Sequence, residues 1–176
     1  QAKIDFYTQQ GKRVLAVGFS QKEMIDSMNA MSIIALIVIQ DEMRQNAKEI
    51  IAYFKKQKIQ VCMISGDDPK TVASLAKLAG IEGSEQYVDV SQCDESMDVL
   101  ASNYTIFGRV RPEEKKQLVC AMQKQGKIVL MSGDGVNDVP ALKVADVSIS
   151  IKDASSAAKN TANIILMDND FSKIPL

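Results

Sequence analysis

The stretch VLMSGDGVNDVPAL, residues 129–142, runs from a continuous apolar segment into a short loop that carries Asp134 and Asp138. An apolar segment that stops abruptly at a polar, glycine-containing loop is typical of a strand buried on both faces, as in parallel sheets covered by helices. A second stretch, VCMISGDDPKT at residues 61–71, has the same pattern and the same Ser-Gly-Asp triplet. Two buried strands are therefore expected to deliver acidic side chains to the loops that follow them.

Apolar runs and amphipathic segments alternate along most of the chain. Right-handed helical crossovers connect parallel strands in such a pattern, which predicts an α/β fold with a doubly wound, mainly parallel sheet. Sheets of this kind bind ligands at the carboxyl ends of their strands. Strands are expected at residues 31–39, 59–64, 86–90, 104–107, 127–131, 146–150 and 163–167, and helices at residues 44–57, 69–80, 94–101, 112–125, 140–145 and 154–160.

Composition restricts the chemistry that the chain can carry. The 176 residues have a formal net charge of −1 with Lys and Arg spread along the chain, so no basic stripe indicates nucleic acid as a partner. The absence of histidine from the sequence excludes histidine-based catalysis and histidine-containing metal sites within this chain. The three cysteines lack CxxC spacing and are expected to be small packing residues. Oxygen ligands and lysines must therefore supply any chemistry.

The triplet Ser65, Gly66 and Asp67 has two interpretations. Serine and aspartate at a strand-to-helix turn can simply cap the helix, and glycine permits the turn. Alternatively, the hydroxyl of Ser65 and the N–H groups of Gly66 and Asp67 hold phosphate oxygens near a helix N-terminus. One loop by itself does not decide between these interpretations.

The loop at residues 133–138 favours a cation site. Asp138 stands two residues before Pro140 and by itself can be an ordinary helix cap. Asp134, however, follows the strand directly between two glycines, with Asn137 close behind. Mg²⁺ binds one or two carboxylates and completes its octahedron with water or phosphate oxygens. The pattern predicts a magnesium site that includes Asp134 and Asp138.

The segment RPEEKK at residues 111–116 places two lysines early in a helix. Lysines on helices are usually solvated, which is the default for Lys115 and Lys116. The first turn behind Pro112 is nevertheless a place where the helix dipole disfavours cations, and this turn is expected to face the acidic edge of the sheet. A lysine in this position is predicted to neutralise phosphate or to pair with a carboxylate.

Taken in order, these segments resemble the haloacid dehalogenase superfamily, and specifically its P-type ion-pumping ATPases. MISGDDPKTVASLAKLAGI at residues 63–81 resembles that family's T-G-D loop and helix, with serine in place of threonine. FGRVRPEEKKQLV at residues 107–119 is similar to its lysine segment, and SGDGVNDVPALKVADVSISI at residues 132–151 to its T-G-D-G-x-N-D segment. QDEMR at residues 40–44 resembles its D-P-x-R signature, with Glu42 in place of proline.

The resemblance implies a Rossmann-like phosphorylation domain that forms an aspartyl phosphate from ATP and hydrolyses it to drive cation transport. On the matching positions, Asp134 coordinates Mg²⁺ with Asp138, and Asn137 and Asp138 order the site. Ser65 contacts phosphate and Lys115 balances charge. Lys115 is expected to point toward the acidic cleft, and Lys116, about 100° further around the helix, to face elsewhere.

A second group of positions is assigned by the same resemblance to the nucleotide side and to domain closure. These residues are Gly66 and Asp67 in the first acidic loop, and Asp41 and Arg44 in the QDEMR segment.

The resemblance also implies a particular domain organisation. Residues 1–25 are expected to be the end of a nucleotide-binding domain, residues 26–172 the phosphorylation domain, and residues 173–176 the start of a link toward a membrane helix. The family's nucleophile lies in D-K-T-G-T, a segment that does not occur in this sequence. We therefore expect an excised piece from the cytoplasmic face of a membrane, whose partners are the nucleotide-binding, actuator and membrane parts of the same polypeptide and the transported cation.

Two other functions fit parts of the pattern. One is a soluble phosphatase of the haloacid dehalogenase superfamily, which also needs a strand-borne nucleophile. The other is a receiver-like binding module with an acidic pocket and no catalysis, which the spacing of GDGVND disfavours.

Overall fold

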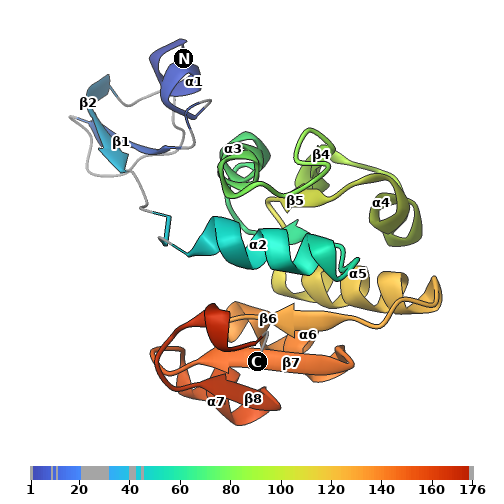
Figure 1. Ribbon diagram of the computed structural model, residues 1–176. Helices are drawn as coiled ribbons and strands as arrows, with labels where there is room; N and C mark the ends of the chain where they lie inside the picture. The colour runs from blue at the N-terminus through green and yellow to red at the C-terminus, as the bar shows by residue number, and fades with distance from the viewer. Residues whose placement is uncertain are drawn as a thin grey trace.

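The computed structural model describes residues 2–8, 10, 12–20, 32–39, 43–44 and 46–174 (Figure 1). The helices are α1 (Ala2–Thr8), α2 (Ala47–Lys56), α3 (Pro69–Ala79), α4 (Met97–Asn103), α5 (Pro112–Lys124), α6 (Val139–Val144) and α7 (Ser156–Thr161). The strands are β1 (Arg13–Phe19), β2 (Ser32–Ile39), β3 (Met63–Ile64), β4 (Tyr87–Asp89), β5 (Ile106–Gly108), β6 (Leu130–Ser132), β7 (Val147–Ile151) and β8 (Ile164–Leu166). Short 3₁₀ helices cover Val90–Gln92, Val136–Asp138 and Phe171–Lys173.

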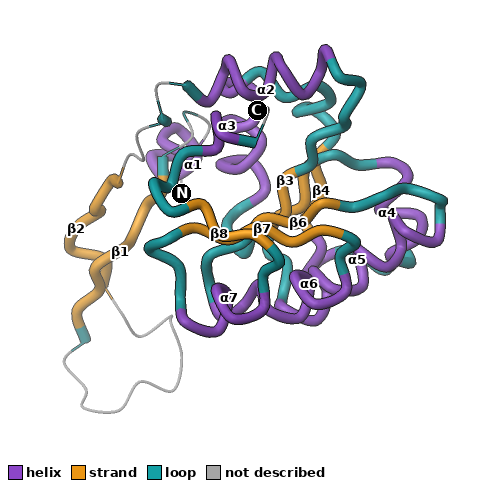
Figure 2. The backbone as a smooth tube through the Cα atoms, turned by 60° about the horizontal axis from the view of Figure 1, so that its bottom comes forward, coloured by secondary structure: helices purple, strands orange, loops and turns teal. Residues whose placement is uncertain are grey.

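Parallel strands form the central layer of the molecule. Strands β3, β5 and β4 make one sheet in that order, and strands β6, β7 and β8 make another, with every pair in both sheets parallel. Figure 2 shows α5, α6 and α7 on one side of the strands, and α2 and α3 on the other. The predicted α/β fold with helices on both faces of mainly parallel strands is confirmed.

The apolar run at residues 31–39 was expected to be a strand of this parallel layer, and that prediction is wrong. Strand β2 pairs antiparallel with β1 in a separate two-stranded sheet, with Ile39 opposite Arg13 and Phe19 opposite Ser32. Most of β2 is exposed, so its apolar character does not arise from burial between the described helices. A continuous apolar run fits several kinds of pairing, and the partner strand decides the direction. The expected domain boundary near residue 25 lies outside the described residues and stays a prediction.

Helix α5 joins the two parallel sheets through its packing. Leu118 and Met122 belong to a buried cluster with Phe107 of β5, whereas Val119 belongs to a second buried cluster with Met131 of β6. The helix begins at Pro112, which suits a first helical position because that N–H needs no partner there. The carboxylate of Glu114 accepts a hydrogen bond of 2.7 Å from the backbone N–H of Arg111 and completes the start of the helix.

The cysteines behave as packing residues, as their spacing predicts. Cys62, Cys93 and Cys120 are free and partly buried, and Cys62 and Cys93 pack against the cluster around Phe107. Burial raises the pKa of the Cys62 thiol, with a smaller opposing effect of Lys127. A thiol in such surroundings is a poor nucleophile.

Crossing a bilayer takes a long apolar helix, and none is found in the part of the chain that the structure describes.

Candidate functional site

The first acidic loop follows β3 and is hydrogen-bonded to the end of β5. The N–H of Ser65 donates to the carbonyl of Phe107 at 2.9 Å, and the N–H of Val110 donates to the carbonyl of Ser65 at 3.0 Å. The N–H of Arg109 donates to the carbonyl of Asp67 at 2.8 Å. These bonds place the Ser-Gly-Asp triplet beside the segment that leads into α5.

The helix cap at this loop is Asp68, and not a member of the triplet. The Asp68 carboxylate accepts from the N–H of Lys70 at 3.0 Å, and Pro69 occupies the first turn of α3. The Ser65 hydroxyl oxygen instead accepts from the N–H of Asp67 at 3.1 Å, within the loop. Capping therefore does not account for the triplet, and its role in phosphate contact stays a prediction.

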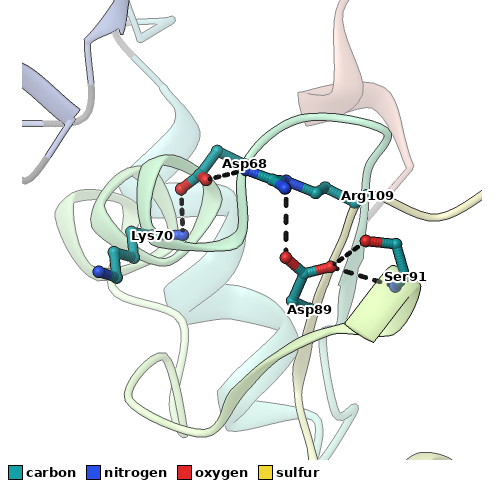
Figure 3. Close-up of polar contacts among 5 residues, drawn as sticks. All are labelled: Asp68, Lys70, Asp89, Ser91 and Arg109. Carbon is teal, nitrogen blue, oxygen red and sulfur yellow. Dashed lines mark hydrogen bonds and ion pairs between the residues drawn. The ribbon is translucent and has the colours of Figure 1, made fainter. Parts of the chain in front are cut away.

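Arg109 connects the ends of three strands (Figure 3). Its guanidinium lies 3.1 Å from Asp68, after β3, and 3.5 Å from Asp89, at the end of β4. The Asp89 carboxylate also accepts hydrogen bonds from the N–H and the hydroxyl of Ser91, at 3.1 Å and 2.6 Å. Arg109 has a φ of 53°, a left-handed conformation that costs energy for a residue other than glycine. Both ion pairs are therefore made by a residue in a strained backbone conformation.

The second acidic loop follows β6 and is organised around Asp138. One carboxylate oxygen of Asp138 lies 2.6 Å from Nζ of Lys115, and both side chains are only 11% exposed. The other oxygen accepts from the N–H groups of Asp134 and Gly135, at 3.3 Å and 3.1 Å. Asp138 thus joins the loop after β6 to the helix that follows β5.

Glycine is required at position 133 by the approach of Asp138. A Cβ atom at Gly133 would lie 2.5 Å from Cβ of Asp138, whereas one at Gly135 would lie 3.4 Å from its nearest carboxylate oxygen. The first distance is far below van der Waals contact and the second is close to it. The Ser-Gly-Asp order therefore has a packing reason in this loop.

The two adjacent lysines of α5 have different surroundings, as the helix periodicity predicts. Lys115 is buried against Asp138, whereas Lys116 pairs with Glu113 at 3.0 Å on the surface of the same helix. The side chains of the surface pair are 41% and 62% exposed. Lys115 is therefore the lysine whose charge acts inside the fold.

Comparison with known proteins gives this geometry a family. Residues 2–146 match the family model described as haloacid dehalogenase-like hydrolase, which covers most of the chain. The chain belongs to this hydrolase family.

This chain has several relatives that are transport ATPases. It is 37% identical over 172 residues to a probable cation-transporting ATPase, exp7, of Streptococcus pneumoniae, a match that covers 95% of this chain and 22% of the relative. It is 38% identical over 172 residues to the calcium-transporting ATPase CtpE of Mycolicibacterium smegmatis, a match that covers 94% of this chain and 21% of the relative. It is 35% identical over 157 residues to calcium-transporting ATPase 1 of Saccharomyces cerevisiae, a match that covers 85% of this chain and 16% of the relative. The chain thus spans about a fifth of the length of these relatives.

The residues after β6 fit a cation held by one carboxylate. The Asp134 side chain is exposed at the carboxyl end of β6, whereas both oxygens of Asp138 already accept hydrogen bonds. Within the described ranges, no group of three or more Cys, Asp and Glu side chains converges as a ready-made metal cage. Mg²⁺ needs no such cage, because it retains water and binds through one or two carboxylates. The arrangement favours Asp134 as a ligand, and the hydrogen bonds of Asp138 order the loop, while the role of Asp138 as a second ligand stays a prediction.

The remaining predicted residues do not join this cluster in the same way. Asn137 lies exposed in the 3₁₀ helix Val136–Asp138, and Asp41 is outside the described residues. Arg44 donates to the carbonyl of Asn169, and its guanidinium lies 5.8 Å from the ring centroid of Phe171. Arg44 therefore attaches the segment before α2 to the C-terminal segment, and no contact with the acidic loops is found for it among the described residues.

A neighbouring contact strengthens that attachment. The side-chain amide of Asn46 donates to the Asp170 carboxylate at 2.9 Å. Hydrogen bonds from Ser172, first from its hydroxyl and then from its N–H, lower the pKa of Asp170, and Asn46 contributes in the same direction.

Two features near the site were missed in the sequence. The cap at Asp68 has a local signal, because an aspartate directly before proline at the start of a helical pattern is typical of an N-cap. The other is the pair of buried serines, Ser148 and Ser150, in β7. Their signal is the alternation SISI within a strand that is expected to be buried on both faces, where a hydroxyl needs a partner.

Proposed function

We propose that this chain is the phosphoryl-transfer unit of a cation-transporting P-type ATPase, in which ATP phosphorylates an aspartate and the aspartyl phosphate is then hydrolysed. The observation that carries the proposal is the buried Lys115–Asp138 ion pair beside the exposed Asp134 at the carboxyl end of β6. The relatives that match nearly the whole chain are cation-transporting ATPases, which supports the same function.

In this proposal Lys115 stabilises the negative charge that develops during transfer. Asp138 holds the ammonium group of Lys115 in a largely buried position, where a fixed charge acts more strongly than in water. Asp134 would hold Mg²⁺, which would supply positive charge to neutralise the phosphate oxygens. Ser65 and the N–H groups of its loop contact the phosphate from the β3 side. The nucleotide side of the site and domain closure are assigned to Gly66, Asp67, Asp41 and Arg44.

The nucleophile in this proposal is an aspartate in a D-K-T-G-T segment supplied by another part of the polypeptide. We place this segment beside β3 or β6, because these strands lead into the two acidic loops and each is an edge strand of its described three-stranded sheet.

The transported species in this proposal is a cation, and the remaining partners are the nucleotide-binding, actuator and membrane parts of the same polypeptide. Such a unit would act at the cytoplasmic face of a membrane.

Two measurements test the proposal. In a longer protein that contains this chain and the nucleophile segment, Lys115→Ala should slow phosphoenzyme formation by about a hundredfold or more, and Lys116→Ala should change it by less than about threefold. Rapid-quench assays with labelled ATP at matched Mg²⁺ give both rates. Equal losses in the two variants would contradict the assigned role of Lys115.

The chain by itself gives the second test. Incubated with γ-labelled ATP and Mg²⁺, it should retain no acid-stable covalent label, because the nucleophile is supplied elsewhere. Retained label would show that a residue within these 176 is phosphorylated, and would overturn the assignment of the nucleophile.

A further inference from the structure

Ser150 is a fully buried residue of β7 whose hydroxyl reaches the second acidic loop. Its exposed fraction is 0%, and its hydroxyl donates to the carbonyl oxygen of Gly133 at 2.9 Å. A buried hydroxyl without a partner is costly, so this hydrogen bond is a strongly determined part of the fold. The acceptor is the backbone carbonyl immediately before Asp134.

The position of that carbonyl sets the direction of a neighbouring N–H group. The carbonyl of Gly133 and the N–H of Asp134 belong to one planar trans peptide group, so fixing one fixes the other. The N–H of Asp134 donates to the Asp138 carboxylate at 3.3 Å. The same carboxylate binds Nζ of Lys115 through its other oxygen at 2.6 Å. A continuous chain of hydrogen bonds therefore runs from Ser150 through this peptide to Asp138 and Lys115.

Other bonds hold the neighbouring peptide groups of this loop, so the Gly133–Asp134 peptide itself is held by Ser150 at its carbonyl and by Asp138 at its N–H. The N–H of Gly133 donates to the carbonyl of Ile149 at 3.1 Å, which continues the ladder between β6 and β7. The carbonyl of Asp134 accepts from the N–H of Ser155 at 2.8 Å. These bonds act on the peptide groups on either side of the one between Gly133 and Asp134.

We propose that Ser150 is a positioning residue for the site: its hydroxyl sets the orientation of the Gly133–Asp134 peptide, and thereby the place of the Asp138 carboxylate and of the Asp134 backbone. Ser150 contacts neither substrate nor cation, and acts only through this peptide. The consequence for cation binding rests on the proposed function, whereas the geometric effect on the loop does not.

Ser148 offers a matched control in the same strand. It is 1% exposed, and its hydroxyl donates to the side-chain oxygen of Asn163 at 2.8 Å. That bond ties β7 to the segment before β8 and not to the loop after β6. The substitutions Ser148→Ala and Ser150→Ala therefore remove the same group from equally buried positions of one strand.

The test compares amide hydrogen exchange in the full chain and in both variants by NMR. Loss of one buried hydrogen bond should accelerate exchange at the N–H groups of Asp134 and Gly135 by about tenfold in Ser150→Ala. The Ser148→Ala variant should leave these two amides within about twofold of the unsubstituted chain, once exchange in the core, at Phe107 and Leu118, is used to correct for global stability. Where Ser150→Ala does not fold, Ser150→Cys keeps the side-chain size with a much weaker donor.

Titration with MgCl₂ gives a second readout. If Asp134 binds Mg²⁺, its dissociation constant should rise by about fivefold in Ser150→Ala and stay within about twofold in Ser148→Ala.

The outcomes separate the two proposals. Unchanged exchange at Asp134 and Gly135 in Ser150→Ala, or equal acceleration in both variants, would overturn the positioning role whether or not Mg²⁺ binds. Selective acceleration of exchange in Ser150→Ala supports the positioning role, even if the unsubstituted chain binds no Mg²⁺. Absence of Mg²⁺ binding would instead count against the cation part of the proposed function. If all three proteins bind Mg²⁺ with equal affinity and loop exchange is unchanged, the proposed function stays intact and the positioning role of Ser150 is overturned.

Discussion

Nζ of Lys115 lies 2.6 Å from a carboxylate oxygen of Asp138, although the two residues are 23 positions apart in the sequence. Lys115 follows β5 of one parallel sheet, and Asp138 follows β6 of the other. Both side chains are 11% exposed. Removing one partner of a buried ion pair leaves the other charge without compensation, which costs far more than the pair itself contributes. The pair is therefore both a site feature and a determinant of stability.

Lys115→Ala should lower the free energy of unfolding by about 3 kcal/mol, because Asp138 would stay buried without its cation. Lys116→Ala should change it by less than about 1 kcal/mol, because its partner Glu113 is solvated. Urea unfolding followed by circular dichroism measures both. The double variant Lys115→Ala/Asp138→Asn should be less destabilised than the sum of its single substitutions, and strict additivity would show that the two side chains do not interact.

Gly133→Ala should destabilise the chain and loosen the second acidic loop, because the added methyl group would lie 2.5 Å from Cβ of Asp138. We expect a loss of about 2 kcal/mol in unfolding free energy, with faster amide exchange at Gly135. Gly135→Ala is the control, since its added Cβ would lie 3.4 Å from the carboxylate. Equal effects of the two substitutions would show that close packing of Asp138 does not explain the requirement for glycine.

Arg109 combines a left-handed backbone with two ion pairs, and two substitutions separate these features. Arg109→Ala removes both ion pairs and keeps a Cβ at the strained position. Arg109→Gly removes the same ion pairs but relieves the strain, so it should be more stable than Arg109→Ala by about 1 kcal/mol. Thermal or urea unfolding of the two variants gives the difference. If Arg109→Ala is the more stable, the conformation is not strained in solution.

Asp146→Asn should reveal a pH-dependent contribution to stability. The N–H of Val129 and, to a smaller extent, the side-chain amide of Gln123 lower the pKa of Asp146 through hydrogen bonds to its carboxylate. A lowered folded-state pKa means that the ionised carboxylate favours folding above the unfolded value of about 3.9, and that this contribution is lost as pH falls through the folded-state value.

The measurement is the urea midpoint at pH 7 and at pH 3. The unsubstituted chain should be more stable than Asp146→Asn at pH 7, and the difference should shrink at pH 3. Asp94→Asn, in an exposed loop, removes the same charge as a control. A difference between the unsubstituted chain and Asp146→Asn that does not change with pH would contradict the assignment.

Much of the site could be predicted from local sequence because its signals are local. A strand that ends in Ser-Gly-Asp brings its acid to the carboxyl edge of a parallel sheet wherever that strand lies in the order. The periodicity of α5 separates Lys115 from Lys116 by about 100°, which is enough to bury one and expose the other. The lengths of the apolar runs and the helical crossovers likewise predicted the α/β class.

Contacts between distant segments could not be predicted in this way. Arg44 meets the carbonyl of Asn169 across 125 positions of sequence, and no local pattern indicates that partner. The antiparallel direction of β2 depends on its pairing with β1. An apolar run predicts a strand but does not indicate which strand it pairs with.

The sequence by itself thus determined the two acidic loops, the lysine that follows Pro112 and the parallel strands that carry them, since each depends on residue order within a few turns of helix or one strand. Only the tertiary structure decided that both carboxylate oxygens of Asp138 accept hydrogen bonds from the protein while Asp134 stays exposed. It also decided that the hydroxyl of Ser150 donates to the carbonyl of Gly133. The physical reason is that hydrogen-bond partners of a buried carboxylate or hydroxyl are set by the packing of β6, β7 and α5 together. Residue type states only that a partner is needed.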